Sequence, residues 1–234
     1  MALAFPVARV MSQTTARTAI AALTLTAIAL LSGVAHADSH DTRVVVRVYD
    51  AVPVTPAMRE AAIRTAAAIV EEAGIAVDWY DCTEQSLQPS CQDSRRTLNF
   101  IVRLMPTFVP AARGSRIALE TRKSARSQQS ELGFAIIDPH TLVGAMATIY
   151  HDRVEAAALG AGVERSELLG RALAHEVGHL LLQSRGHSPS GLMRAVWTDE
   201  ELIRNRADDW AFAASDRDRV HHLLAHADRI ELRR

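Results

Sequence analysis

The sequence has little net charge, and it lacks two common functional motifs. Lys and Arg number 26 against 27 Asp and Glu, so the formal net charge is −1. No large basic field is available to attract nucleic acid or an anionic membrane, and we expect neither as a partner. The chain also contains no glycine-rich phosphate loop and no Gly-x-Ser-x-Gly motif. These absences argue against a phosphate-binding NTPase and against a serine hydrolase.

Cysteine is also scarce, since only Cys82 and Cys91 are present. Neither lies near the histidine motif described below, which argues against a structural zinc site that uses cysteine. In an exported protein, a cysteine pair that closes a short loop containing Pro and Ser is typical of a disulfide. We therefore predict a Cys82–Cys91 disulfide, with free thiols as the alternative. No cysteine follows the N-terminal apolar segment to accept a lipid.

The N-terminus is typical of a secretory signal peptide. Arg9 and Arg17 precede an uncharged stretch, Ala19 to Val34, that ends in the small-x-small sequence Ala35-His36-Ala37. A membrane span needs roughly 20 apolar residues, which is more than this stretch offers; a retained anchor is the alternative. We predict that residues 1–37 are a signal peptide and that residues 38–234 form one secreted or periplasmic domain without a stable membrane span. The sequence does not define an oligomeric state.

Alternating strand and helix patterns predict a mixed α/β (α+β) domain with a mixed sheet. Between the third and fourth strands, residues 105–131 are polar and aperiodic, as in functional or mobile loops. Ser166 is the expected N-cap of the long helix, and Gly186 is expected near its far end. The predicted strands are 42–49, 75–80, 97–104, 133–138 and 145–150, and the predicted helices are 55–74, 166–184, 198–210 and 216–229.

The long helix contains the motif H-E-x-x-H, formed by His175, Glu176 and His179. Four residues turn a helix by about 400°, so the two histidines share one face, one turn apart. Two imidazoles at this separation can bind one zinc ion, while Glu176 can reach a water on the metal. The alternative is a pair of semi-buried histidines bonded to carboxylates or to the backbone.

A catalytic zinc typically has three protein ligands, and the next histidine in the chain is His187. It follows Gly186, where the chain can reverse its direction toward the helix. Glu200 and Glu201 are alternative third ligands, as in gluzincins, although acidic residues are also favoured at any helix N-terminus. We predict His187 as the third ligand.

These residues resemble the metzincin clan of zinc endopeptidases. The similarity extends to Met193, and the run from His187 to Met193 is especially similar to the matrixin-like pattern of His-Ser, a short spacer and Leu-Met. The resemblance implies a zincin-like fold, in which a mixed twisted sheet has a backing helix, an active-site helix and C-terminal helices. It implies zinc bound by His175, His179 and His187, Glu176 as the general base, and Met193 in a Met-turn beneath the metal.

The spacing of the third histidine departs from the usual pattern H-E-x-x-H-x-x-G-x-x-H. Leu182 and Arg185 occupy the positions of that glycine and third histidine. We therefore expect either a longer helix or a wider turn before His187. The predicted function is that of an exported zinc-dependent endopeptidase acting on peptide or protein substrates. The alternative is a non-catalytic zinc-binding domain, which would have no use for Glu176 as a base.

Other polar and aromatic residues are expected to be structural. Tyr150-His151-Asp152 is typical of a surface strand end, and Trp197 is expected to contribute packing. His221, His222 and His226 have a spacing that does not converge on one point, so we expect a solvated helix face there.

Overall fold

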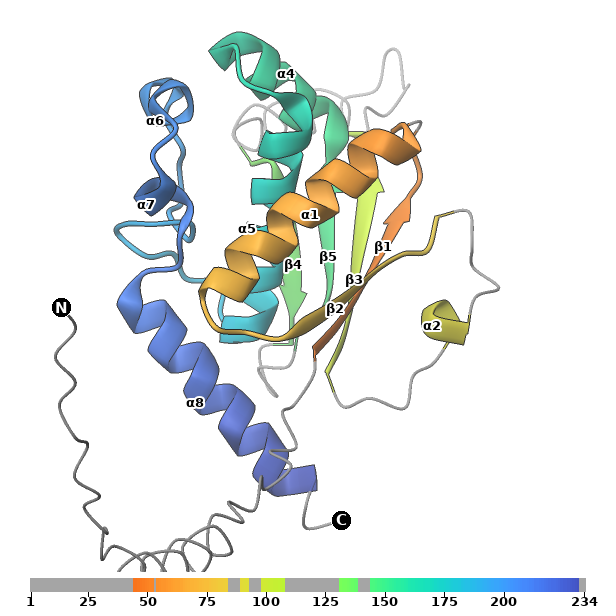
Figure 1. The fold of residues 1–234 in the computed structure, drawn as a ribbon, viewed down its shortest axis with the longest axis vertical. Helices are drawn as coiled ribbons and strands as arrows, with labels where there is room; N and C mark the ends of the chain where they lie inside the picture. Colours follow the sequence, from red (N-terminus) through yellow and green to blue (C-terminus); the bar gives the residue numbers. More distant parts are fainter. Residues whose placement is uncertain are drawn as a thin grey trace, which may run out of the picture. The chain divides into compact units, whose positions relative to one another are not determined.

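The computed structural model describes residues 44–52, 54–83, 89–92, 98–107, 131–138 and 144–231. Its centre is a five-stranded sheet, shown in Figure 1. The strands are β1 (Val44–Asp50), β2 (Val77–Asp81), β3 (Asn99–Met105), β4 (Gly133–Ile137) and β5 (Gly144–Tyr150). In the order β2-β1-β3-β5-β4, all neighbours are parallel except β4, which pairs antiparallel with β5 at the edge. The predicted mixed α/β architecture is confirmed.

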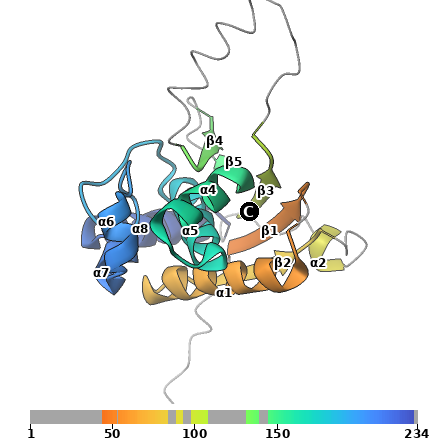
Figure 2. The same cartoon turned by 90° about the horizontal axis from the view of Figure 1, so that it is seen from above.

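Helices α1 (Pro56–Glu72) and α5 (Arg165–Leu182) pack together on one face of the sheet, as Figure 2 shows. Helix α5 also contacts β4 and β5, so it lies beside the edge strand. The remaining helices are α2 (Pro89–Gln92), α4 (His151–Ala161), α6 (Asp199–Arg204), α7 (Ala207–Trp210) and α8 (Ala214–Glu231). None of the helices in the described ranges is long and apolar enough to cross a membrane.

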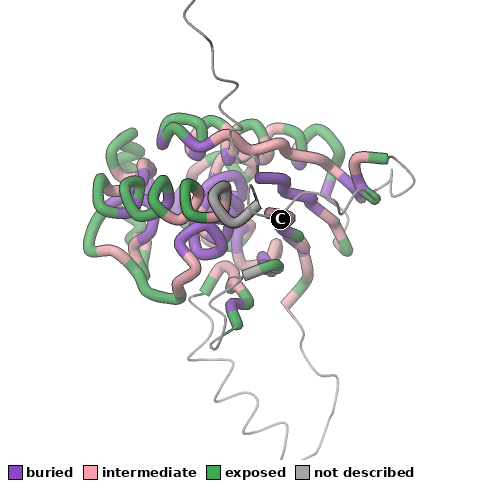
Figure 3. The backbone as a smooth tube through the Cα atoms, turned by 90° about the horizontal axis from the view of Figure 1, so that it is seen from below, coloured by how far each residue is buried: buried purple, intermediate pink, exposed green. Residues whose placement is uncertain are grey.

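The core lies between the sheet and the helices (Figure 3). Successive side chains of a strand point to opposite faces, so alternate residues of β1 and β3 face the helices. Those facing residues are among the least exposed in the structure: Val44, Val46, Val48, Phe100, Val102 and Leu104. Helix α5 is buried along almost its whole length, because it packs against both α1 and the sheet and also contacts α8.

On the opposite face of β1, two side chains contact α2, which carries Cys91. Cys82 and Cys91 are bonded, which confirms the predicted pair. Arg47 of β1 donates from Nε to the carbonyl oxygen of Ser90 at 2.8 Å, and the Tyr49 hydroxyl donates to the carbonyl oxygen of Cys91 at 3.4 Å. Helix α2, which the disulfide links to the end of β2, therefore contacts a buried arginine on this side of the sheet.

The ends of α5 differ from the prediction. Ser166 is not the N-cap, because the Glu164 side chain accepts the backbone N–H of Glu167 at 2.9 Å and the helix begins at Arg165. The helix ends before Gly186, with Gln183 as C-cap in the left-handed region at φ 49°. The left-handed turn that usually favours glycine is therefore made by glutamine.

Two further elements differ from the predicted ones. Strand β5 ends at Tyr150, as predicted, but His151 directly begins helix α4, which the sequence did not predict. The predicted helix 198–210 is divided at Asn205, which adopts φ 49° and separates α6 from α7. The predicted signal peptide and most of the polar segment 105–131 lie outside the described residues.

Candidate metal centre

Three histidines converge beside the edge of the sheet. His175 and His179 lie one turn apart on α5, and His187 comes from the segment after the helix. One ring nitrogen of each lies within 4.8 Å of the others, and the Nε2 atoms of His175 and His179 are 3.1 Å apart. Within the described ranges, no other group of His, Cys, Asp or Glu side chains is arranged in this way.

Backbone carbonyls determine which nitrogens of the helical pair carry protons. His175 Nδ1 lies 2.9 Å from the carbonyl oxygen of Leu192, and His179 Nδ1 lies 2.8 Å from that of Ser184. A carbonyl only accepts, so each neutral ring must carry its proton on Nδ1 and a lone pair on Nε2. The two lone pairs then face each other at 3.1 Å.

This pair of Nε2 atoms fits a metal ion. Two lone pairs in contact repel, and a cation between them removes the repulsion. Two nitrogens about 2.0–2.1 Å from a tetrahedral zinc ion are separated by about 3.3 Å, close to the 3.1 Å observed here. Outer N–H groups held by carbonyls are also the usual support for metal-binding histidines.

Burial keeps these imidazoles neutral, which is the form that binds metal. Burial, together with the neighbouring His179 and His187, lowers the pKa of His175 to about 3 against the opposing effect of the Leu192 carbonyl. Burial likewise lowers the pKa of His179, although its bond to the Ser184 carbonyl opposes the shift. Protons therefore compete weakly for the two Nε2 atoms at neutral pH.

The Glu176 side chain lies between the backbone of α5 and the edge strand β4, and the residue is 5% exposed. Its Oε2 atom is buried and has no hydrogen-bond partner among the described residues. A Cβ atom at Gly133 of β4 would lie 2.8 Å from Glu176 Oε1, so only glycine lets the strand approach this closely. Burial, and then the charge of Glu131, raise the pKa of Glu176 to about 8.

A longer helix or a wider turn was expected before His187, and the structure has the wider turn. The helix does not continue; a wider turn leaves it after Leu182. The guanidinium of Arg185 donates to the carbonyl oxygen of Ile137 at the end of β4, at 3.1 Å. The backbone N–H of Ser188 donates to the carbonyl oxygen of Met193 at 2.8 Å. Compared with the usual spacing, two additional residues separate His179 from His187. They are accommodated in a turn that is hydrogen-bonded both to the sheet and to the Met193 segment.

Met193 lies fully buried against the backbone of α5. A Cβ atom at Gly178, inside the H-E-x-x-H motif, would lie 2.5 Å from Met193 Sδ and 3.0 Å from the Phe212 ring. The turn before Met193 passes through Gly191 at φ 74°, and the N–H of Leu192 donates to the carbonyl oxygen of Ala211 at 2.8 Å. Met193 thus packs directly beneath the helix turn that joins Glu176 to His179.

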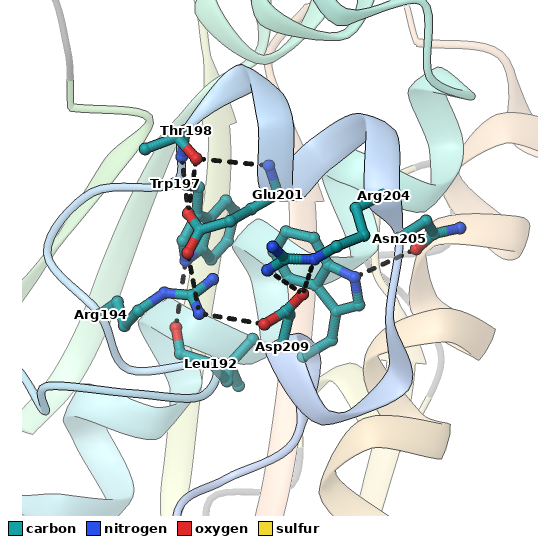
Figure 4. Close-up of polar contacts among 9 residues, drawn as sticks. Leu192, Arg194, Trp197, Thr198, Glu201, Arg204, Asn205 and Asp209 are labelled. Atoms are coloured by element: carbon teal, nitrogen blue, oxygen red, sulfur yellow. Dashed lines mark hydrogen bonds and ion pairs between the residues drawn. The ribbon is translucent and has the colours of Figure 1, made fainter.

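Trp197 contributes more than the packing that the sequence predicts. Its ring lies edge-on to His175, with centroids 5.4 Å apart, and edge-on to Trp210 at 5.3 Å. Figure 4 shows its Nε1 donating to the Leu192 carbonyl oxygen at 3.3 Å, the same oxygen that faces His175 Nδ1. The histidine and the tryptophan therefore share one acceptor, which no sequence pattern marks.

Of the two alternative third ligands, Glu201 has other partners. Glu201 forms a capping box with Thr198, whose backbone N–H lies 2.9 Å from Glu201 Oε2 (Figure 4). Glu201 also pairs with Arg194 at 3.2 Å, and Arg194 lies 3.4 Å from Asp209. Neither Glu201 nor the exposed Glu200 belongs to the group of converging ligand atoms.

Comparison with known proteins adds little to this geometry. No protein-family model and no curated protein matches the sequence. Among solved structures, the chain is similar to a crystal structure of archaemetzincin from Methanopyrus kandleri, with 12% sequence identity and a TM-score of 0.44. That similarity covers 80% of this chain and 98% of the other.

Proposed function

We propose that this chain is an exported zinc-dependent endopeptidase, with His175, His179 and His187 as ligands and Glu176 as the general base. The observation that carries the proposal is the pair of Nε2 lone pairs at 3.1 Å beside a buried carboxylate with an unpartnered oxygen. A structural zinc site needs no carboxylate of this kind, and such sites are usually closed by four ligands.

Each residue has a defined task in peptide hydrolysis. A zinc ion held by the three histidines would supply Lewis acidity toward a carbonyl oxygen and a positive charge that favours the carboxylate form of Glu176. Glu176 accepts a proton at Oε2 from the water that attacks the peptide carbonyl. It then returns this proton to the leaving amine nitrogen as the C–N bond breaks. The Leu192 and Ser184 carbonyls hold the two helical imidazoles in the orientation that metal binding requires.

The substrate class follows from the position of the site. Glu176 lies against β4, the edge strand of the described sheet, next to Gly133. An edge strand presents backbone groups that can pair with an extended peptide. A peptide held in this way would have its backbone beside Glu176. We propose Met193 as the Met-turn residue, which supports the site from beneath the helix through its contact with Gly178.

Export is part of the proposal and depends on the N-terminal sequence. The charged, apolar and small-x-small regions of residues 1–37 are typical of a cleaved signal peptide. The Cys82–Cys91 disulfide is compatible with an oxidising compartment. We propose a secreted or periplasmic location for residues 38–234.

The proposal is tested by measuring bound metal and peptide cleavage together. Elemental analysis of the purified chain should give about one zinc per chain, and His187→Ala should lose it or bind it much more weakly. Glu176→Gln should keep the zinc while turnover of a peptide mixture falls about 10²–10⁴-fold, the usual contribution of a general base. Glu200→Gln is the matched control, because it removes an exposed carboxylate and should retain both zinc and activity.

Other outcomes would redirect the assignment. Zinc retained in His187→Ala but lost in Glu200→Gln or Glu201→Gln would move the third ligand to the carboxylate. A wild type that binds zinc, cleaves no peptide and shows no effect of Glu176→Gln would favour a non-catalytic zinc domain. Absence of zinc from the wild type would refute the metal site altogether.

A further inference from the structure

We propose that Asp216, in the first turn of α8, is a positioning residue for His187 and acts through Ser188. The inference rests on the proposed zinc site and extends it to a helix distant from the H-E-x-x-H motif in the sequence. The geometric basis is a buried carboxylate whose two oxygens both accept from the hydroxyl of the residue after His187.

His187 is the least constrained of the three histidines. His175 and His179 lie on a buried helix, and a backbone carbonyl fixes each ring. His187 is exposed, lies in a turn, and has no hydrogen bond to its ring within the described part of the chain. The orientation of its side chain must therefore depend on how firmly its backbone is held.

Ser188 supplies that support at two points. Its backbone N–H donates to the Met193 carbonyl oxygen at 2.8 Å. Its hydroxyl lies 2.7 Å from both carboxylate oxygens of Asp216. Hydrogen bonds to an ionised acceptor are stronger than those between neutral groups, so the bond to Asp216 is the firmer of the two.

Asp216 is well placed to act as a fixed support. Asp216 is 8% exposed, and its carboxylate accepts a hydrogen bond from the Ser188 hydroxyl. The N-terminal turn of α8 favours a negative charge there. The helix itself is anchored at Val220, which is fully buried, and at His221, whose Nε2 lies 2.9 Å from the Ala73 carbonyl oxygen. Ser188 is thus attached to an element that cannot move without disturbing the core.

The wide turn makes this attachment necessary. A longer turn has more conformations to lose when it delivers its ligand to the metal. Arg185 attaches the start of the turn to β4, and Ser188 with Asp216 attaches its end to α8. We infer that without the second attachment His187 samples positions away from the other two ligands, so the zinc affinity falls.

The test measures zinc affinity by competition with a chromophoric chelator, for the full chain and for Ser188→Ala, Asp216→Ala and the double variant. Removal of a partner that supports a metal ligand lowers metal affinity about 10–100-fold, and we expect this loss in both single variants. The double variant should show about the same loss, because both substitutions break one attachment. Asp218→Ala is the matched control, since Asp218 is an exposed aspartate of the same helix and should leave the affinity unchanged.

Thermal unfolding in the presence of excess chelator separates positioning from general stability. If Ser188→Ala and Asp216→Ala lower the unfolding midpoint but keep the wild-type zinc affinity within about 2-fold, the proposal is wrong. Should either variant fail to fold, Asp216→Asn replaces it, because the amide keeps the side-chain volume and one hydrogen-bond acceptor. A loss of zinc affinity smaller than that expected for the alanine variants supports the proposal, and an unchanged zinc affinity overturns it. Failure of the proposed function is distinct, since the wild type would then bind no zinc or cleave no peptide.

Discussion

Substitution of Gly178 by alanine tests whether Met193 packs as tightly beneath α5 as the structure indicates. Gly178 lies in the interior of the helix, where alanine is favoured over glycine by about 1 kcal/mol. The added Cβ would lie 2.5 Å from Met193 Sδ and 3.0 Å from the Phe212 ring. Non-bonded carbon atoms prefer about 3.5–4.0 Å, so the sulfur atom would have to move by about 1 Å or more.

Neither neighbour has room for such a shift. Met193 is 0% exposed and Phe212 is 4% exposed, so both are enclosed by other core residues. Overpacking of a well-packed core costs about 1–3 kcal/mol, and the upper part of that range applies where two large side chains are blocked together. After the gain in helix propensity, we expect Gly178→Ala to lower the free energy of unfolding by about 1–2 kcal/mol.

The assay is denaturant unfolding in excess chelator, so that metal binding does not contribute to the free energy of unfolding. Gly160→Ala in α4 is the control, because no heavy atom lies within 4 Å of the Cβ it would add. That variant should be stabilised by as much as about 1 kcal/mol. If Gly178→Ala is as stable as the wild type or more stable, the contact between Met193 and the helix is not as tight as described and the reasoning fails.

Three further perturbations have defined outcomes. Burial raises the pKa of Asp81, but the Thr83 N–H and the Arg59 guanidinium outweigh it and leave that pKa below its ordinary value. The resulting stabilisation is present above the unfolded pKa of about 3.9 and is lost as the pH falls through the lower folded pKa. Asp81→Asn should therefore be less stable than the wild type by about 1 kcal/mol at pH 7. Urea titrations should show this difference in the free energy of unfolding disappear below about pH 4. Free zinc at about 100 times its dissociation constant should raise the free energy of unfolding by about 2.7 kcal/mol, and chelation should abolish this gain. An unfolding midpoint that does not change with zinc would contradict the metal site. The disulfide spans a separation of 9 residues, so replacement of Cys82 and Cys91 by serine should cost about 2–3 kcal/mol in thermal unfolding, whereas no change would mean that the loop is held by its other contacts.

The parts of the fold that sequence predicts well are those set by local pattern. All five strands and helices α1, α5 and α8 are found close to their expected positions. Val44 to Val48 are mostly β-branched, which favours a strand, and the apolar residues from Leu168 to Leu182 recur at helical spacing. Helix α4 was missed, because its start at His151 directly follows a strand without a turn residue between them. The break at Asn205 was also missed, although asparagine is one of the few residues enriched in the left-handed conformation.

At the candidate site, sequence predicts the side chains and misses their support. The spacing of His175 and His179 places them on one face of a helix, which geometry alone ensures. The carbonyls of Leu192 and Ser184 that orient their rings are backbone groups, and any residue could supply them. The bond from Ser188 to Asp216 joins residues far apart in the chain, so it depends on how α8 packs rather than on any local pattern.

The burial of α5 divides the site into a fixed and an adjustable part. Two of the three histidines belong to the most deeply packed helix of the domain, so their separation is set by the core itself. The third stands on an exposed turn whose length can change without altering any buried residue. Redesign of metal preference or of access to Glu176 can therefore act on the stretch between Ser184, whose carbonyl orients His179, and His187, where an error would weaken one ligand and leave the folded domain intact.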